Sequence, residues 1–596
     1  MKLRVFSSLP ILPSFFLIIM VALPLLPVPG YWITLINYIG LYSLVALGLV
    51  LLTGIGGLTS FGQAAFVGIG AYTTAYFSTA MDVSPWFGLF IGLGLTLISA
   101  LAIGMITLRM AGHFLPLATI AWGLSLYYLF GTLEVLGQYD GLLGLPAISF
   151  FGFELRSSEE IYYLIWLFVL LAVWSVNNLL NSRPGRAIRA LRDGPEMAEA
   201  MGVNTQWKKV VIFLYAAALA SVSGWLFAHM QRAVSPSPFN LVSGIEYLFM
   251  AVLGGILHVW GAVIGAAAFI LSKELIQGIV PLVGIEVNIE LIIFGMMIAL
   301  VLIFARNGLW SLVEHFIPPN RKIEFNPDAA PLTKRIKPEV GSRVLTVNSI
   351  VKRFGGLVAV NGLSFHIDAG EVLGLIGPNG AGKSTTFNLV TGTLSATEGD
   401  IHFCGESLKG EHAREIVARG LGRTFQHVQL IPDMTVIENV ALGAYLRGSF
   451  SAQGGVIASL FKLNKNEEDR ALAEASRQLK RVGLEDEMYQ EAGSLSLGKQ
   501  RVVEIARALC SDPLLLLLDE PAAGLRHKEK EELADLVLQL KSEGMSLLLV
   551  EHDMDFVMNV TDRILVVEFG TPIATGTPSE IRENPKVIEA YLGGIE

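Results

Sequence analysis

The chain has 596 residues and a formal net charge of −9, and 53% of its residues are hydrophobic while 16% are charged. The charge is unevenly placed: the first 316 residues hold 27 charged side chains, whereas the remaining 280 hold 68. This step predicts a membrane half followed by a soluble half. The net acidity argues against a nucleic-acid partner, and the two cysteines, both in the soluble half, predict neither a disulfide framework nor a metal site.

Ten apolar stretches in the first half are predicted to cross a membrane. Basic residues stay on the cytoplasmic side of a bilayer, and with a cytoplasmic N-terminus ten of the thirteen in this half lie there. The first stretch could serve as a secretory signal, but its four prolines and the spans that follow favour an uncleaved helix. The stretches are 11–29, 33–53, 61–80, 86–108, 114–136, 161–181, 208–230, 245–257, 261–280 and 288–305.

Glycines interrupt two of these apolar stretches. The segment Thr53–Gly62 carries four glycines, and Gly254–Gly255 interrupts a later stretch. Backbone groups freed at membrane depth are tolerated only where they line a cavity or are buried in protein. The breaks therefore predict a path for a solute, or else they only allow helices to pack closely.

A phosphate-binding loop stands in the second half. It reads GPNGAGKST, follows the strand-like run VLGLI, and fits the pattern G-x-x-x-x-G-K-[ST]. Glycines let backbone N–H groups surround phosphate oxygens, a lysine reaches the β- and γ-phosphates, and a serine holds Mg²⁺. The sequence therefore predicts an ATP and Mg²⁺ site made of Gly377, Pro378, Asn379, Gly380, Ala381, Gly382, Lys383, Ser384 and Thr385.

Two carboxylates end a second buried strand, LLLLLDE, further along the chain. A carboxylate at such a strand end can organise Mg²⁺, which suits Asp519. The next residue, Glu520, is placed to polarise the attacking water. A run of this kind is often an ordinary strand entering a helix, but its position after the phosphate loop favours catalysis.

With these motifs, residues 344–596 resemble an ATP-binding-cassette domain, which is an α/β fold of the P-loop NTPase type. The resemblance implies that Phe354 stacks on adenine, and that Gln426 contacts Mg²⁺ and the water and couples to the membrane domain. It also implies that His552 is the switch histidine, and that Ser496 and Gly498 form the signature that meets the γ-phosphate.

The signature region departs from the family pattern. Leu497 and Lys499 stand where relatives more often have Gly or Tyr and then Gln. Arg526 and His527 stand where relatives usually have Asp or Asn and then Pro. We therefore expect this signature to be a weaker partner surface, with unequal ATP sites in the assembled protein.

The membrane half resembles the permease family of branched-chain amino acid importers. The resemblance rests on Gly48–Phe77, Arg183–Asn204, Phe249–Ala267 and Ile303–Glu314. It implies that the loop Arg183–Asn204, with its arginines and then its glutamates, docks on an ATPase; a plain solvated loop is the alternative. The cassette resembles the ATPase of the same transporters.

The predicted organisation is an all-α permease of about ten spans at 1–316, a proline-rich linker without a core at 317–343, and the cassette at 344–596. We expect ATP-driven uptake of branched-chain amino acids across a bacterial inner membrane, with the cassette in the cytoplasm. The expected partners are a second permease and cassette, in a hetero-oligomer or a homodimer, and a periplasmic or lipoprotein substrate-binding protein.

Three alternatives to this function remain open. The first is an importer of urea, short amides or another small carboxylate. The second is an exporter half, which shares the order of domains but usually has six long helices with cytoplasmic extensions. The third is an ATPase with a membrane anchor, which needs only one or two spans.

Overall fold

The computed structural model describes residues 20–108, 114–279, 290–304, 308–314, 323–448 and 455–592. The chain forms two compact units. The first comprises Met1–Leu179 with Gln206–Pro319, and the second comprises Leu180–Thr205 with Asn320–Glu596. The predicted first span, 11–29, lies mostly outside the described residues, so it stays a prediction.

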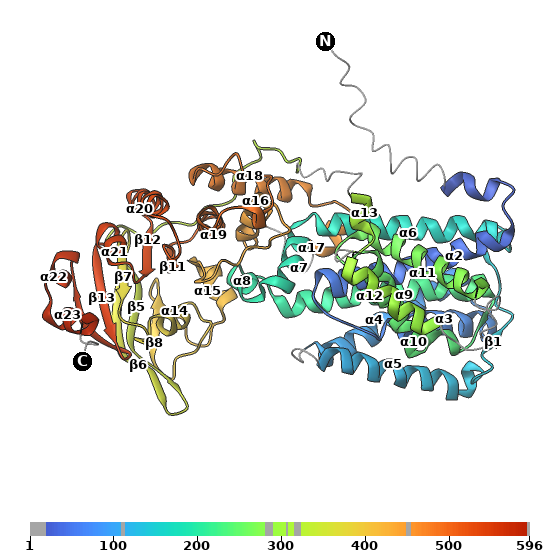
Figure 1. Ribbon diagram of the computed structural model, residues 1–596. Helices are drawn as coiled ribbons and strands as arrows, with labels where there is room; N and C mark the ends of the chain where they lie inside the picture. Colours follow the sequence, from blue (N-terminus) through green and yellow to red (C-terminus); the bar gives the residue numbers. More distant parts are fainter. Residues whose placement is uncertain are drawn as a thin grey trace, which may run out of the picture. The chain divides into compact units, whose positions relative to one another are not determined.

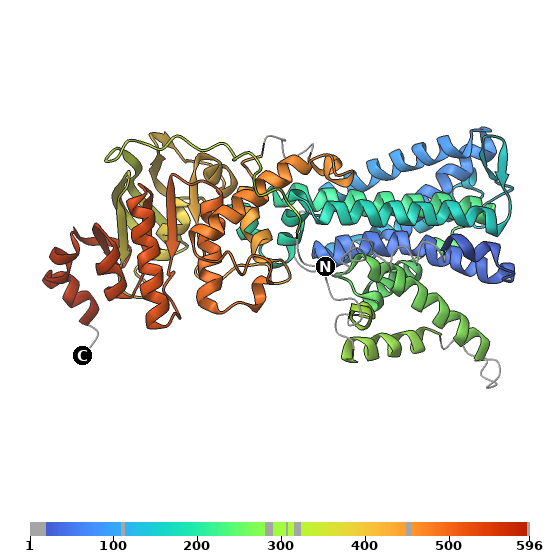
Figure 2. The ribbon, with the colours of Figure 1, turned by 90° about the horizontal axis from the view of Figure 1, so that it is seen from above.

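The first unit is a bundle of apolar helices, visible in Figures 1 and 2. Among the described residues, six helical stretches are long and apolar enough to cross a membrane. Because this count is six, the predicted number of about ten spans is not confirmed. The α-helices described in this unit, including those too short or too polar to count as spans, are α2 (Gly30–Leu49), α3 (Gln63–Ala80), α4 (Pro85–Thr107), α5 (Phe114–Thr132), α6 (Ser158–Leu180), α9 (Thr205–Gln231), α10 (Leu241–Gly254), α11 (Val259–Ile279), α12 (Glu290–Phe304) and α13 (Trp310–Glu314).

Large apolar side chains stay exposed on the outer helices of this bundle. On α4, Phe90 and Ile98 are each 67% exposed, and on α5 Phe114 is 65% exposed. Exposed apolar side chains of this size are costly in water and suit contact with lipid. The low charge content of the first half and its exposed apolar side chains therefore both indicate a membrane domain.

The two predicted glycine breaks are real interruptions of helices. The helix α2 continues into a π-helical turn, η2 (Val50–Ile55), and the chain is then non-helical until α3 begins at Gln63. The second break follows α10 at Gly255, whose φ is 116°. A Cβ at Gly254 would lie 1.8 Å from the carbonyl oxygen of Gly261, so close backbone packing requires glycine there.

Two sheets organise the second unit. The six-stranded sheet has the order β10 (Leu421–Arg423), β11 (Leu515–Asp519), β12 (Ser546–Val550), β7 (Val372–Ile376), β13 (Arg563–Glu568) and β14 (Thr571–Gly576). Its first five strands are parallel, and β14 is antiparallel. The four-stranded antiparallel sheet has the order β6 (Leu357–Asp368), β5 (Arg343–Phe354), β8 (Glu398–Phe403) and β9 (Glu406–Ser407).

Helices and apolar clusters complete the second unit. One buried cluster joins the two sheets around α14, and a second lies beneath α19, α20 and α21. A third cluster holds the helical region made of α16, α18 and α19. The helices are α7 (Arg183–Asp193), α8 (Pro195–Ala200), α14 (Lys383–Val390), α15 (Ala413–Arg419), α16 (Val436–Ala441), α17 (Gly455–Leu460), α18 (Lys465–Arg481), α19 (Leu497–Cys510), α20 (His527–Ser542), α21 (Met554–Val560), α22 (Pro578–Arg582) and α23 (Pro585–Leu592).

The described part of the predicted linker is bound along the cassette and shares the core of the cassette. Leu332 is 4% exposed and belongs to the helical-region cluster. The guanidinium of Arg335 donates to the carbonyl oxygens of Ser511, Asp512, Val417 and Ala418. The prolines predicted an extended chain, but apolar and carbonyl partners on the cassette fix that chain in place.

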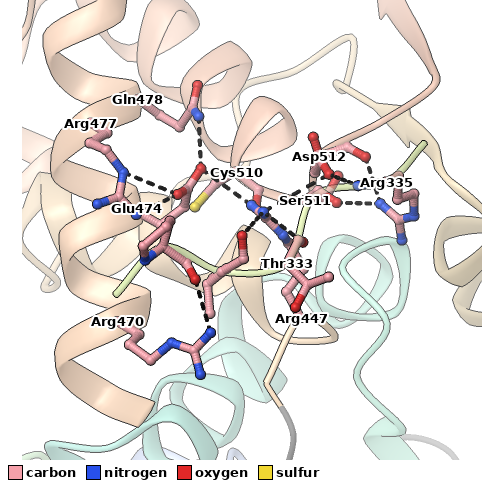
Figure 3. A network of polar contacts seen from close by, with 12 residues as sticks. Thr333, Arg335, Arg447, Arg470, Glu474, Arg477, Gln478, Cys510, Ser511 and Asp512 are labelled. Carbon is pink, nitrogen blue, oxygen red and sulfur yellow. Dashed lines mark hydrogen bonds and ion pairs between the residues drawn. The ribbon is translucent and has the colours of Figure 1, made fainter. Parts of the chain in front are cut away.

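The network in Figure 3 completes this attachment. Arg447 donates to the carbonyl oxygen of Thr333 on the linker and forms a 3.2 Å ion pair with Glu474. Arg470 donates to the carbonyl oxygens of Ala330 and Pro331. In this network the linker accepts hydrogen bonds through its backbone carbonyl groups. Every residue carries such a group, so the residue types of the linker do not reveal this attachment.

Candidate functional site

The phosphate loop lies between β7 and α14, where its sequence predicts it. Its backbone needs glycine at two places: Gly382 has a φ of 92°, and a Cβ there would lie 2.4 Å from the carbonyl oxygen of Ala359. At Gly377 a Cβ would lie 2.1 Å from the carbonyl oxygen of Val567. The loop can therefore close tightly at the N-terminus of α14, which favours an anion.

Lys383 folds back over this loop. Its Nζ donates to the carbonyl oxygens of Gly377 at 2.7 Å and Pro378 at 3.0 Å. Burial lowers the pKa of Lys383, while the charges of Glu520 and Asp519 raise it. The ammonium group is thus held at the loop, where it would neutralise the phosphates of a nucleotide.

A pocket of about 440 Å³ opens at the phosphate loop. It has room for the polar and aromatic groups of a nucleotide, and it brings Phe354, Gln426 and Glu520 together with the loop. Its complete lining is Phe354, Leu357, Val358, Ala359, Asn379, Gly380, Ala381, Gly382, Lys383, Ser384, Thr385, Gln426, Glu520 and Phe569.

Glu520 and its two polar neighbours lie close together. The side-chain amide of Gln426 donates to a carboxylate oxygen of Glu520 across 3.2 Å. His552 Nδ1 lies 3.8 Å from the same oxygen, and the His552 side chain is 56% exposed. The three proposed catalytic side chains therefore meet at one point, although they come from different parts of the chain.

Asp519 presents a free oxygen for a cation. It ends β11 and is 5% exposed, and its Oδ1 has no hydrogen-bond partner among the described residues. Burial raises the pKa of Asp519 to about 6, although the charge of Arg423 opposes the shift. Mg²⁺ prefers oxygen ligands, so Asp519, Ser384 and Gln426 fit the ion together with nucleotide phosphates.

Glu551 is a buried residue that the motifs did not single out. Its side chain is fully buried, and it accepts hydrogen bonds from the backbone N–H groups of Ala522 at 2.7 Å and His552 at 3.0 Å. It thereby links the loop after Glu520 to the loop that carries His552. The signal was present in the sequence, since Glu551 follows the apolar strand SLLLV as Asp519 follows LLLLL.

The signature residues lie elsewhere, outside the lining of this pocket. Ser496 caps α19 by accepting from the N–H of Lys499, and Leu497 is 46% exposed. A Cβ at Gly498 would lie 2.6 Å from a carboxylate oxygen of Glu529. Lys499 forms an ion pair with Glu487. Within one chain, the signature therefore does not complete the nucleotide pocket.

The loop predicted to dock on an ATPase belongs to the same compact unit as the cassette. Ala190 of α7 and Met197 of α8 lie in one buried cluster with Phe425 and Tyr445 of the cassette. Phe425 precedes Gln426, and Arg501 donates to the carbonyl oxygen of Phe425 at 2.6 Å. The loop thus packs against the residue that adjoins the nucleotide pocket.

Arginines of the loop, rather than its glutamates, form ion pairs with the cassette. Arg186 is 2% exposed and pairs with Glu468 of α18. Arg189 lies 3.4 Å from Glu438, and Arg192 lies 3.3 Å from Asp433. Glu199 instead accepts a hydrogen bond from Thr205, and Glu196 is exposed.

The arginines therefore form the charged side of the loop that meets the cassette. The spacing of the arginines by three residues places them along one side of α7, as expected. The sequence could not show which charged set meets the cassette, because the acidic partners come from two segments far from the loop, one around Asp433 and Glu438 and one at Glu468.

This geometry defines a class of protein: a membrane permease with an ATP-hydrolysing cassette, in which a permease loop packs against Phe425 beside the nucleotide pocket. Residues 31–302 match the model of the branched-chain amino acid transport system permease component. Residues 360–523 match the ABC transporter model, and residues 571–596 match the branched-chain amino acid ATP-binding cassette transporter model.

Individual proteins match the cassette. The high-affinity branched-chain amino acid transport ATP-binding protein LivG of Salmonella typhimurium is 45% identical over 253 residues, which is 42% of this chain and 98% of LivG. The corresponding protein BraF of Pseudomonas aeruginosa is 44% identical over 255 residues, covering 42% of this chain and 98% of BraF. A crystal structure of a nucleotide-free ATP-binding cassette from an ABC transporter is 34% identical with a TM-score of 0.37, covering 42% of this chain and 98% of that one.

The chain belongs to the branched-chain amino acid ABC transporter family. It is a fusion of the permease component and the ATP-binding component, and its cassette hydrolyses ATP in a cycle coupled to transport.

Proposed function

We propose that this chain is one half of an importer that takes up leucine, isoleucine and valine across the bacterial inner membrane. The packing of the permease loop against Phe425, next to Gln426, carries the proposal. This contact gives the permease a direct mechanical link to the nucleotide pocket. The solute class follows from the permease family match and from LivG and BraF, which are named for branched-chain amino acid transport.

The proposed chemistry uses residues around the pocket. Phe354 stacks on adenine, the loop from Gly377 to Thr385 holds the phosphates, and Glu520 polarises the attacking water. Mg²⁺, held by Ser384, Gln426 and Asp519, would neutralise charge on the phosphates. His552 and Gln426 orient the carboxylate of Glu520 and respond to the nucleotide in the pocket.

The proposed assembly contains a second permease and a second cassette. Ser496 and Gly498 lie outside the pocket of their own chain, so a second cassette that presents its signature would complete each site. A substrate-binding protein on the outer face would deliver the amino acid. Lys499, which is paired with Glu487, leaves this signature with fewer free donors and supports unequal sites.

The experiment is uptake of labelled leucine into proteoliposomes that hold all subunits, with ATP inside and binding protein outside. ATP-dependent accumulation of leucine, isoleucine and valine is the expected result. Uptake of urea or a short amide without any branched-chain amino acid would overturn the solute and keep the architecture. ATP-dependent extrusion would overturn the direction.

A further inference from the structure

The break before α3 leaves a helix N-terminus inside the permease. Between Gly56 and Gly62 the chain is non-helical, and the cap residue Gly62 provides no side-chain hydrogen bond. The backbone N–H groups of Gln63 and Ala64 have no acceptor among the residues that the structure describes. Both residues are buried, at 1% and 3% exposure.

The side chain of Gln63 adds a second, independent observation. Both polar atoms of its amide, Nε2 and Oε1, are buried and have no hydrogen-bond partner in the described part of the chain. Gln63 is the first residue of α3, so its side chain belongs to the same helix end as the free N–H groups. Polar groups buried without partners are costly, most of all at membrane depth.

A small pocket lies at the same helix end. Ser60, Gly62, Phe66, Thr119 and Trp122 are among the residues that line it. Its other lining residues are mostly apolar, and no charged residue lines it. It measures about 10 Å³, which is the room of one water molecule. Gln63 and Ala64 are not among its lining residues. The pocket therefore has to widen toward them before a solute enters, as expected of an alternating-access transporter in one state of its cycle.

Some neighbouring polar groups at this break have partners within the protein. The N–H of Phe61 donates to Thr119 Oγ1 at 3.2 Å, and the N–H of Gly62 donates to Ser60 Oγ at 3.4 Å. Thr53 Oγ1 donates to the carbonyl oxygen of Leu58 at 3.1 Å. The N–H groups of Thr59 and Ser60 have no acceptor among the described residues either, so free donors lie on both sides of the satisfied pair Phe61 and Gly62.

We propose that the end of α3 is the binding site for the polar part of the transported solute, an amino acid zwitterion. The N–H groups of Gln63 and Ala64 bind the carboxylate at the positive end of the helix dipole. The amide oxygen of Gln63 accepts from the ammonium group, and its nitrogen donates to the carboxylate. The apolar wall formed by Phe66, Trp122 and their neighbours receives an aliphatic side chain.

This assignment rests on the proposed function and names the site that the function requires. A helix end and an amide replace the water around a zwitterion with dipoles. A fixed charge would instead hold the solute strongly and slow its release. A purely structural glutamine would be expected to have partners inside the protein, because a buried amide without them destabilises the fold.

The test compares Gln63→Leu and Gln63→Glu with the exposed control Gln206→Leu in the assembled complex. The readouts are labelled leucine uptake into proteoliposomes and the thermal unfolding temperature of the purified complex. We expect Gln63→Leu to lower uptake at least tenfold while the unfolding temperature stays equal or rises, because a buried unpaired amide is removed. Gln206→Leu should leave both values unchanged.

Gln63→Glu supplies a charge-specific readout. Uptake by this variant should fall as the pH rises through the titration of the introduced carboxyl group, because its charge repels the solute carboxylate, whereas wild-type uptake should show no such step. Wild-type rates of leucine uptake in Gln63→Leu, or an unfolding temperature that falls together with uptake, would overturn the site. Absence of leucine uptake by the wild type would instead overturn the proposed function, so the two failures are distinguishable.

Discussion

Gln426 donates its side-chain amide to Glu520 across 3.2 Å, although 94 positions separate the two residues in the chain. The preceding residue, Phe425, is 4% exposed and lies in the cluster that holds the permease loop. One short segment therefore touches the proposed catalytic carboxylate and the loop of the permease. We therefore expect a movement of the permease loop to shift Gln426 relative to Glu520, and a movement at Glu520 to be transmitted to the loop.

Glu520→Gln should retain ATP binding and lose most ATP turnover, by about 100-fold or more, because the neutral amide cannot polarise the attacking water. Turnover is measured in the assembled complex, and binding is measured with a fluorescent ATP analogue. Glu531→Gln, whose side chain is 65% exposed and pairs with His527 on the surface, is the matched control. Near-normal turnover at this chain's site in Glu520→Gln would remove Glu520 from its role.

Arg186→Glu should sharply reduce solute-stimulated ATPase activity, because it places two carboxylates together at a site where Arg186 is buried. Combining it with Glu468→Arg should restore part of the activity. The double change Glu196→Lys with Glu199→Lys should cost much less, since neither glutamate forms an ion pair with the cassette among the contacts described. The opposite order of losses would show that the acidic side of the loop couples the domains.

Phe354→Ala should weaken ATP binding by roughly tenfold, because stacking of an aromatic ring on a base contributes about 1–3 kcal/mol. Phe354→Tyr keeps the ring and should bind ATP almost as the wild type does. Equilibrium binding to the complex measures both variants. Equal affinity in wild type and Phe354→Ala would show that Phe354 does not stack on adenine. Phe569, which also lines the pocket and is 81% exposed, would then be the aromatic side chain to test.

We expect Glu474 to make the stability of the folded cassette decrease at acid pH. Burial raises its pKa, but hydrogen bonds from Arg477 and Gln478 and the charge of Arg447 outweigh burial, so the net pKa lies below the usual 4.5. A carboxylate with a lowered folded pKa stabilises the fold above its unfolded pKa, and this contribution is lost as pH falls below about 4.5 and through the folded value.

Thermal unfolding of the complex between pH 7 and pH 3.5 tests this expectation. Glu474→Gln should lower the unfolding temperature at pH 7 and flatten its dependence on pH in the acid range. Glu485→Gln is the control, because Glu485 is 55% exposed and lies 4.0 Å from Lys480. A wild-type pH profile in Glu474→Gln would show that the network of Figure 3 adds no acid-sensitive stability.

The local order of residues was enough to predict the nucleotide loop and the strands beside it. Backbone conformation at Gly377 and Gly382 is imposed within a few residues, and a buried strand shows as an apolar run. The glycine breaks before α3 and after α10 were readable for the same reason. The step in charge density likewise separated membrane from soluble residues, since that property is additive along the chain.

Only the tertiary structure decided which distant groups meet. It brought Glu551 to the backbone of Ala522, directed Arg186 rather than Glu199 to the cassette, and bound the linker through Arg335 to carbonyl oxygens. It also left the amide of Gln63 buried without a partner among the residues that the structure describes. Pairing depends on packing between segments far apart in sequence, and backbone acceptors look alike in every residue, so neither can be read from local pattern alone.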